Sequence, residues 1–297
     1  MIRIGLVDFD TSHVQAFTQR LNHVDCPESD WVQGARVVAG CPGTSEMMPE
    51  RIPGYRDALA GYGVELVEEP EALIGKVDAV MVESQQGSKH LEHALRFLRA
   101  GLPVYVDKPF AGSLAEADAM LAEAERAGLP LMSCSALRYD PTVVAARAAC
   151  ESLGPILAVD AWTPAALHPG NPGMSHYAIH GLEMLYALLG PDCREVSMTF
   201  TPVGEVVAGV WESGHVSTVR GIRTGHAGMG FTAHHEKGRQ THVVAGSTFY
   251  TRMLEAVVGM FASGASPIPR GELRGIVAFM DAAERSRLAG GVPTPLA

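Results

Sequence analysis

A strand, a helix and a second strand follow one another in residues 104–133, which read VYVDKPFAGSLAEADAMLAEAERAGLPLMS. Val104–Val106 and Leu129–Ser133 are short apolar runs, while Leu114–Ala127 is rich in Ala and Glu and has the apolar spacing of a helix. Gly128 follows that helix at a position that tolerates a left-handed cap. Apolar strands joined through an amphipathic helix indicate a parallel sheet covered on both faces.

The same alternation of short apolar runs and helical segments continues back to the N-terminus. Strands are expected at Ile2–Val7, Arg36–Ala39, Val64–Val67 and Ala79–Val82. Helices are expected at His13–Asn22 and His90–Ala100. The strands are nearly continuous in apolar residues, which is typical of strands buried on both faces. The sequence therefore predicts an α/β fold in which residues 1–137 form a Rossmann-like, doubly wound domain.

After about residue 140 the pattern changes to period-two segments joined by short turns that contain glycine. Strands are expected at Ile156–Trp162, Glu195–Thr201, Val206–Trp211, His215–Ile222, Phe231–His235 and Thr241–Ala245. Helices are expected at Pro141–Glu151, from about His176 to Leu189, at Phe249–Phe261 and at Gly271–Leu288. Alternation of apolar and polar residues predicts a largely antiparallel sheet with one packed and one solvated face. Residues 138–297 are therefore expected to form an α+β domain for substrate binding and oligomerisation.

The composition excludes some classes of partner. The 297 residues include 33 acidic and 23 basic side chains, and the formal net charge is −10. This balance repels phosphate backbones and anionic lipids, so we expect neither nucleic acid nor a membrane as a partner. No apolar run approaches the roughly 20 residues that span a bilayer, and MIRIGLVDFD does not read as a secretory leader. Five scattered cysteines indicate reduced thiols, and we expect a cytoplasmic protein.

Ligands of doubly wound sheets bind at the carboxyl ends of the strands. The segments in that position are Asp8–His13, Cys41–Ser45, Glu83–Lys89 and Asp107–Phe110. In the last of them, Lys108 follows a buried strand and precedes a proline, which holds the side chain where a substrate oxygen could meet it. A solvated lysine at a strand end is the alternative explanation.

Four motifs follow one another along the chain. Asp107-Lys108-Pro109 ends a strand, Arg138-Tyr139-Asp140-Pro141 comes next, HYAIHGLEMLYALLG occupies 176–190, and GELRGIVAFMDAAERSRLAGG occupies 271–291. In this order and spacing they resemble the Glu/Asp-Lys-Pro, Arg-x-x-Pro, Asp-x-x-x-His-x-x-Asp and C-terminal helix motifs of the glucose–fructose oxidoreductase / inositol dehydrogenase / MocA (Gfo/Idh/MocA) family. The similarity covers nearly the whole chain.

This resemblance implies NAD(P)-dependent oxidation or reduction of a hydroxyl or keto group on a sugar, cyclitol or related polyol. Lys108 matches the family's lysine that hydrogen-bonds the reacting hydroxyl, and His180 matches the histidine that exchanges its proton. An imidazole suits that role near neutral pH. We expect substrate contacts from Arg138, Tyr139 and Glu183. The resemblance also implies a homodimer or homotetramer.

The chain departs from the family at the turn after the first strand, where G-x-G-x-x-G is expected. Asp8, Asp10 and His13 stand at the three glycine positions. Two carboxylates there repel a pyrophosphate, although Thr11, Ser12 and the start of the next helix could donate hydrogen bonds to it. The segment Asp10-Thr11-Ser12 could equally serve only as the N-cap of that helix.

The second strand ends without the acidic residue that binds the adenosine ribose in this family. Thr44 and Ser45 follow it instead, so the cofactor could be NAD or NADP. The residues that we expect to contact it are Asp10, Thr11, Ser12, His13, Thr44, Ser45, Glu83 and Lys108.

A third departure lies around His180, where His176 and Glu183 replace the family's two aspartates. The spacing predicts that the three share one helical face, and we include His176 among the catalytic residues. We assign no metal ligand, although a His-x-x-x-His pair can chelate a transition metal with a third ligand, and packed or capping histidines are a further explanation. Candidates for that third ligand are His13, Asp8, Asp10, Glu83, His168 and His226. The alternative function is a family member that has lost dinucleotide binding and acts as a metal-dependent or cofactor-independent lyase or hydrolase, or binds a sugar.

Overall fold

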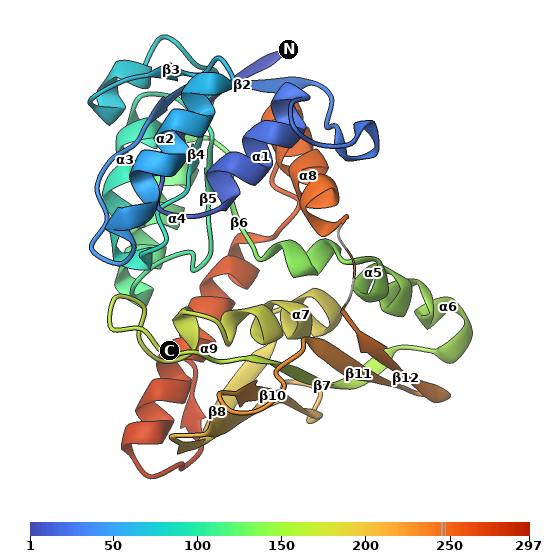
Figure 1. The fold of residues 1–297 in the computed structure, drawn as a ribbon. Coiled ribbons are helices and arrows are strands. Elements are labelled where there is room, and N and C mark those ends of the chain that lie inside the picture. The colour runs from blue at the N-terminus through green and yellow to red at the C-terminus, as the bar shows by residue number, and fades with distance from the viewer. Residues whose placement is uncertain (245, 247) are drawn as a thin grey trace. The chain divides into compact units, whose positions relative to one another are not determined.

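The chain folds into two compact units in the computed structural model, which describes residues 1–244, 246 and 248–297 (Figure 1). The Rossmann unit comprises Met1–Cys134 and Tyr250–Pro269, and the C-terminal unit comprises Ser135–Phe249 and Arg270–Ala297. The boundary expected between residues 137 and 138 thus falls between residues 134 and 135, and residues 250–269 return to the first unit.

A six-stranded parallel sheet forms the centre of the Rossmann unit. Its strands are β1 (Ile2–Val7), β2 (Ala35–Cys41), β3 (Glu65–Leu66), β4 (Ala79–Val82), β5 (Val104–Val106) and β6 (Leu131–Ser133). Their order is β3-β2-β1-β4-β5-β6, and every neighbouring pair is parallel. The strand order reverses between β1 and β4, and such a reversal opens a ligand crevice at the carboxyl ends of the strands. The predicted doubly wound sheet is confirmed.

Five α-helices belong to this unit or begin at its edge. They are α1 (His13–Asn22), α2 (Ile52–Gly61), α3 (His90–Arg99), α4 (Leu114–Ala127) and α8 (Phe249–Ser263), with 3₁₀ turns η1 (Glu28–Asp30), η2 (Pro49–Arg51), η3 (Pro70–Leu73) and η4 (Gly87–Lys89). Helix α2 was not predicted, because Pro and Gly lie near its start and Leu59 is its one buried residue. A helix that buries so little shows no apolar period to detect.

The C-terminal unit is built on a seven-stranded sheet. The strands are β7 (Ile156–Pro164), β8 (Cys193–Thr201), β9 (Gly204–Trp211), β10 (Val216–Ile222), β11 (Gly230–His235), β12 (Gly238–Val243) and β13 (Thr294–Pro295), in the order β12-β11-β7-β10-β9-β8-β13. All neighbours are antiparallel except β7 and β10, which are parallel. Buried and partly exposed residues alternate along β9, as expected of a sheet with one packed face. The strand expected at Thr241–Ala245 begins at Gly238, and Ala245 lies outside the described residues.

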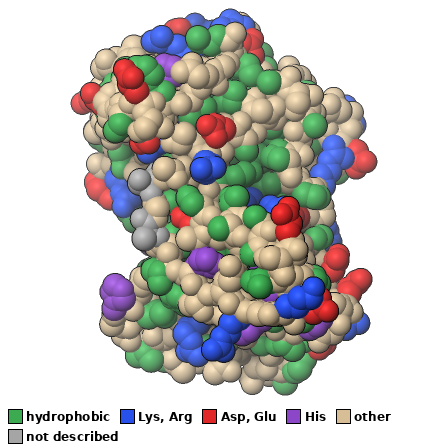
Figure 2. Space-filling view, turned by 90° about the vertical axis from the view of Figure 1, so that its right-hand side faces the viewer, with side chains coloured by type: hydrophobic (Ala, Val, Ile, Leu, Met, Phe, Trp, Pro, Cys, Tyr) green, Lys and Arg blue, Asp and Glu red, His purple; other side chains and the backbone are tan. Residues whose placement is uncertain are grey.

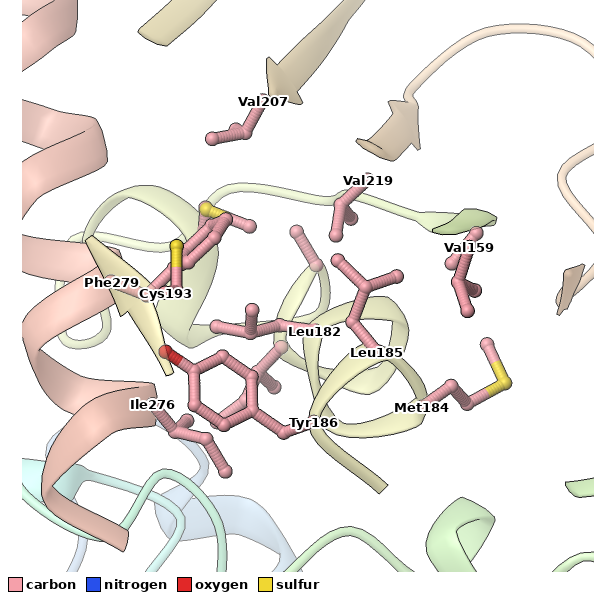
Figure 3. Close-up of a cluster of buried hydrophobic side chains, with 14 of the residues drawn as sticks. Val159, Leu182, Met184, Leu185, Tyr186, Cys193, Val207, Val219, Ile276 and Phe279 are labelled. Carbon is pink, nitrogen blue, oxygen red and sulfur yellow. The ribbon is translucent and has the colours of Figure 1, made fainter. Parts of the chain in front are cut away.

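Helices cover the packed face of this sheet. They are α5 (Pro141–Ala148), α6 (Cys150–Leu153), α7 (Ile179–Leu189) and α9 (Arg270–Leu288), with 3₁₀ turns η5 (Ala136–Tyr139) and η6 (Gly173–Ser175). Figure 3 shows Leu185 of α7 facing Val219 of the sheet, and Leu182 directed toward the side of Ile276 and Phe279 of α9 in the same core. The core is therefore continuous from the sheet through α7 to α9.

Helix α7 begins three residues later than the sequence predicts. His176 lies in the turn before it, where His180 and Gly181 make tight i→i+3 bonds to the carbonyls of Tyr177 and Ala178. The prediction that His176, His180 and Glu183 share one helical face required a regular helix from His176 onward. His176 instead precedes the helix, so that spacing does not hold for it.

Three further observations concern the surface charge, the cysteines and the apolar content of the helices. On the face shown in Figure 2, acidic and basic side chains are interspersed. All five cysteines carry free thiols. Within the described residues, no helix has both the length and the apolar content to cross a lipid bilayer.

The close packing of α7 on the sheet gives a testable prediction about Gly181. A Cβ there would lie 2.9 Å from Val219 Cγ1 and 3.0 Å from Thr163 Cγ2, closer than unstrained packing allows. We expect Gly181→Ala to lower the free energy of unfolding by about 1–2 kcal/mol, because the strain outweighs the gain in helix propensity. Gly271→Ala in α9 is the matched control, since a Cβ there meets no atom within 4 Å. Urea unfolding of both variants tests this: equal effects would contradict the packing.

Candidate functional site

The turn between β1 and α1 lies at the strand-order reversal, and it contains no glycine. Asp8 begins it with a φ of 62°, a left-handed conformation that glycine adopts readily and aspartate adopts at a cost. The carboxylate lies against Gly43 in the loop after β2, where a Cβ would stand 1.8 Å from Asp8 Oδ1. Only glycine fits at residue 43, so the two loops are fitted to each other.

Asp8 and Asp10 are both buried, and each is held by donors from other loops. Asp8 accepts a hydrogen bond from the Ser84 hydroxyl, and His93 Nε2 lies 3.2 Å from it. Burial favours a high pKa for Asp8, but His93, Ser84 and Lys89 outweigh it and lower the pKa below its ordinary value.

The partners of Asp10 offset the burial of its carboxylate less completely than those of Asp8 do. It accepts bonds of 2.6 Å from the Ser45 hydroxyl and 2.9 Å from the Gln85 amide. Burial nevertheless raises the pKa of Asp10 above its ordinary value, and the neighbouring Asp8 charge adds to the effect.

His13, Glu83 and Asp107 converge at the same edge of the sheet. His13 begins α1, Glu83 follows β4 and Asp107 follows β5. His13 Nδ1 lies 2.7 Å from Asp107 Oδ2 and 4.0 Å from Glu83 Oε2. Both carboxylates are fully buried. Burial raises the pKa of Glu83 well above its ordinary value, and the neighbouring Asp107 and Asp10 add to the effect. Burial also acts to raise the pKa of Asp107, but His13 and Lys108 together outweigh it, so this pKa is lowered.

His90 holds the two loops that carry these groups. Its Nδ1 lies 2.8 Å from the carbonyl oxygen of Pro109, and its Nε2 lies 2.7 Å from that of Ser84. Lys108, which directly precedes Pro109, is 9% exposed. Its backbone N–H donates to Asp107 Oδ1 over 2.7 Å. The lysine predicted to act on substrate is thus fixed at the carboxyl end of β5.

A pocket of about 690 Å³ opens beyond the ends of β2 and β3. Thr44, Gly43, Lys89 and His93 are among the residues that line it. The Lys89 ammonium donates to the carbonyl oxygen of Thr44, so a cation stands beside the residue predicted to bind the adenosine ribose. Lys89 ends the predicted segment Glu83–Lys89, but its contact with Thr44 was not predicted, because the two residues come from different loops.

The predicted residues of the C-terminal unit form two groups. In the first, the Ser135 hydroxyl lies 2.7 Å from Nδ1 of the half-buried His180. The Tyr177 ring packs edge-on against His180, and His176 packs near His168 with ring centroids 5.4 Å apart. In the part of the chain that is described, the only three potential metal ligands within reach of one another are His13, Glu83 and Asp107, which does not include this histidine pair.

Arg138 and Glu183 form the second group and pair with each other. Arg138 Nε lies 3.3 Å from Glu183 Oε2, and the guanidinium also donates to Glu272 of α9. All three side chains are buried, whereas Tyr139 is half-buried. Burial raises the pKa of Glu183 to about 7, since Arg138 only partly offsets burial and the negative Glu272.

Ser84, Lys89 and Asp107 lie in the segments predicted at the carboxyl ends of the strands, although no role was assigned to them. His93, Ser135 and Glu272 lie outside all of these segments. One signal was present: Glu83 and Asp107 directly follow successive strands of a parallel sheet, whose carboxyl ends share one edge. Of the remaining predicted cofactor contacts, Thr11 is buried, and Ser12 is exposed at the start of α1 without a side-chain capping bond.

The six-stranded parallel sheet in this order, with its reversal between β1 and β4, has the topology of the Rossmann fold. Residues 46–134 match the Gfo/Idh/MocA family model, described as an oxidoreductase family with an NAD-binding Rossmann fold. This segment of the chain is therefore similar to the Gfo/Idh/MocA family, as the four motifs predict. The matched segment starts after β2 and so leaves out the β1–α1 turn.

Two curated relatives are similar over part of their length. The chain is 33% identical over 124 residues to YhhX, an uncharacterized oxidoreductase of Escherichia coli, covering 38% of this chain and 36% of that protein. It is 33% identical over 117 residues to D-apiose dehydrogenase of Paraburkholderia graminis, covering 38% of this chain and 29% of that enzyme. The chain thus matches about a third of each relative's length.

Solved structures share the fold over the whole chain. Myo-inositol dehydrogenase of Lactobacillus casei, in complex with NAD(H) and myo-inositol, aligns with a TM-score of 0.81 at 15% identity, covering 100% of this chain and 97% of that one. An oxidoreductase of Agrobacterium radiobacter, in complex with NAD⁺, L-tartaric acid and magnesium, aligns with a TM-score of 0.77 at 17% identity, covering 99% and 98%. At these identities the likeness is one of fold.

The pKa of Glu183 predicts a pH dependence of stability. Because its folded-state pKa of about 7 lies above the ordinary 4.5, the folded chain keeps a proton that the unfolded chain releases between these values. The stability from this group is complete below about pH 4.5 and is lost as the pH rises through 7, by about 3 kcal/mol at most. Glutamine has nearly the shape of a protonated glutamate but does not titrate. The free energy of unfolding of Glu183→Gln should therefore lack this decline with pH. Urea unfolding at pH 5 to 8 measures the difference, and parallel curves for parent and variant would refute it.

Proposed function

We propose that the protein is an NAD(P)-dependent oxidoreductase that acts on a hydroxyl or keto group of a sugar, cyclitol or related polyol. The observation that carries the proposal is Lys108, held at the carboxyl end of β5 beside the strand-order reversal of a family-matched sheet. A buried cation at that edge suits a substrate oxygen that gains negative charge. Relatives that oxidise D-apiose and myo-inositol support the substrate class.

The Rossmann unit offers groups for both ends of a dinucleotide. We assign the pocket of about 690 Å³, which Thr44 and Lys89 help to line, to the adenosine, and Ser45 follows Thr44 in the same loop. The Ser12 side chain makes no capping bond at the start of α1, and only a long bond of 3.4 Å joins the His13 amide to Thr11 Oγ1, so Thr11, Ser12 and His13 can present donors to a pyrophosphate. We assign Asp10 and Glu83 to the remaining contacts. The bound cofactor supplies the hydride acceptor or donor.

Two side chains share the proton and charge chemistry in this proposal. During oxidation a hydride leaves the carbinol carbon, His180 takes the hydroxyl proton, and the Lys108 ammonium stabilises the developing alkoxide. Ser135 orients the imidazole, and His176 lies close to it in the chain as the third catalytic residue. In the reductive direction the same groups act in reverse.

The substrate contacts in this proposal are Arg138, Tyr139 and Glu183. The ion pair between Arg138 and Glu183 also ties η5 to α7, the helix that carries His180. We further propose a cytoplasmic homodimer or homotetramer that takes a small polyhydroxylated substrate and neither nucleic acid nor a membrane.

One observation favours a second candidate. The β1–α1 turn places buried carboxylates, Asp8 and Asp10, where the backbone amides of a glycine-rich turn would meet a pyrophosphate. The alternative is therefore a family member without dinucleotide binding, which acts as a lyase or hydrolase or binds a sugar.

Calorimetric titration with NADH and NADPH separates the two candidates. We expect at least one of them to bind with a micromolar dissociation constant, about −8 kcal/mol, because the pocket and the α1 terminus compensate for the missing glycines. Circular dichroism first establishes that the protein is folded. Folded protein that gives no heat at millimolar concentrations of either cofactor would leave the second candidate in place.

Substitution of the two reacting groups tests their roles. Lys108→Met keeps the packing of the stem without the charge, and His180→Asn keeps a polar group without a base. Each should lower turnover of the best substrate among myo-inositol, scyllo-inositol and D-apiose by about 10²–10⁴. Lys76→Met and His234→Asn, at exposed ion pairs, are the controls and should keep parental turnover and melting temperature. Full activity of His180→Asn would show that another residue moves the proton.

A further inference from the structure

We infer that His13, Glu83 and Asp107 form a binding site for a divalent transition-metal ion at the carboxyl edge of the parallel sheet. The site lies entirely within the Rossmann unit, and it shares His13 and Glu83 with the cofactor contacts proposed above. One ligand comes from the start of α1, and the other two follow the neighbouring strands β4 and β5.

The separations between the three donor atoms suit one cation. His13 Nδ1 lies 2.7 Å from Asp107 Oδ2 and 4.0 Å from Glu83 Oε2, and all three lie within 4.8 Å of one another. Metal–ligand bonds of about 2.0–2.2 Å require ligand atoms roughly 3–4.4 Å apart. A shift of a few tenths of an ångström at His13 and Asp107 therefore admits the ion.

Glu83 supplies the independent reason to expect an ion. Its side chain is fully buried, and neither carboxylate oxygen has a hydrogen-bond partner among the described residues. A buried carboxylate without a partner is costly, and its nearest charged neighbours include Asp107 and Asp10, which make the site more negative. The His13 imidazole and Lys108 interact with Asp107. A dication between Glu83, Asp107 and His13 balances the site.

The residues around the ligands already orient them. The Lys108 amide binds Asp107 Oδ1 and so turns Oδ2 toward His13. The His13 ring stacks on Phe17 with centroids 4.8 Å apart, and Tyr250 packs edge-on against it at 5.4 Å. Supporting contacts of this kind fix ligand geometry in metal sites. One imidazole with two carboxylates is a ligand set suited to Zn²⁺, Mn²⁺ or Fe²⁺ more than to Ca²⁺, which prefers oxygen alone.

Metal content and calorimetry on untagged, EDTA-treated protein test the site. With ZnCl₂ or MnCl₂ as probe and no dinucleotide present, we expect one equivalent per chain and a rise in melting temperature on binding. Glu83→Gln, Asp107→Asn and His13→Gln should each weaken binding at least 30-fold. His93→Gln is the matched control, because it alters another buried His–carboxylate pair of the same unit and should change the affinity less than threefold.

X-ray absorption on the metal-loaded parent keeps the test decisive if a variant fails to fold. The expected spectrum shows one imidazole nitrogen and otherwise oxygen ligands. Less than 0.1 equivalent bound, sulfur ligation, two or more imidazoles, or unchanged affinity in folded Glu83→Gln would each overturn the site. Cofactor titration decides the oxidoreductase proposal separately, so the two can fail independently.

Discussion

Burial of four carboxylates at one edge of a parallel sheet is the constraint on which the site depends. Asp8, Asp10, Glu83 and Asp107 all lie where strands or turns end, and all are shielded from water. A buried charge must be offset by hydrogen bonds or opposite charges. The donors that offset Asp8, Asp10 and Asp107 come from other loops, so the carboxylates hold those loops in their relative positions.

This network explains how the chain keeps the Rossmann architecture while the turn between β1 and α1 has a different chemistry. A glycine-rich turn lets backbone amides approach a pyrophosphate, whereas Asp8 takes the left-handed conformation itself and fills the space above Gly43. Lys108 keeps its place after β5, stabilised through Asp107 and the His90 bridge. The change is thus one of charge at the sheet edge, and charge determines which anion or cation can bind there.

The C-terminal unit uses a comparable device for a different purpose. Arg138 joins Glu183 of α7 to Glu272 of α9 inside the core, and one buried cation between two carboxylates leaves an unbalanced charge. A proton on Glu183 near neutral pH removes that imbalance. The pairing ties the helix that bears His180 to the rest of its unit, so the orientation of the imidazole depends on core contacts as well as on Ser135.

The sequence by itself determined the elements whose signals are local. The runs at Ile2–Val7, Ala79–Val82 and Val104–Val106 and the helix at Leu114–Ala127 have their predicted bounds, because apolar period and caps are written within each segment. The position of Lys108 after a strand followed in the same way. Only the tertiary structure decided the rest. Asp8 meets Ser84, and His13 meets Asp107, across 76 and 94 residues of chain. Such pairings depend on which strands become neighbours and how their loops pack, and no spacing within one segment encodes that.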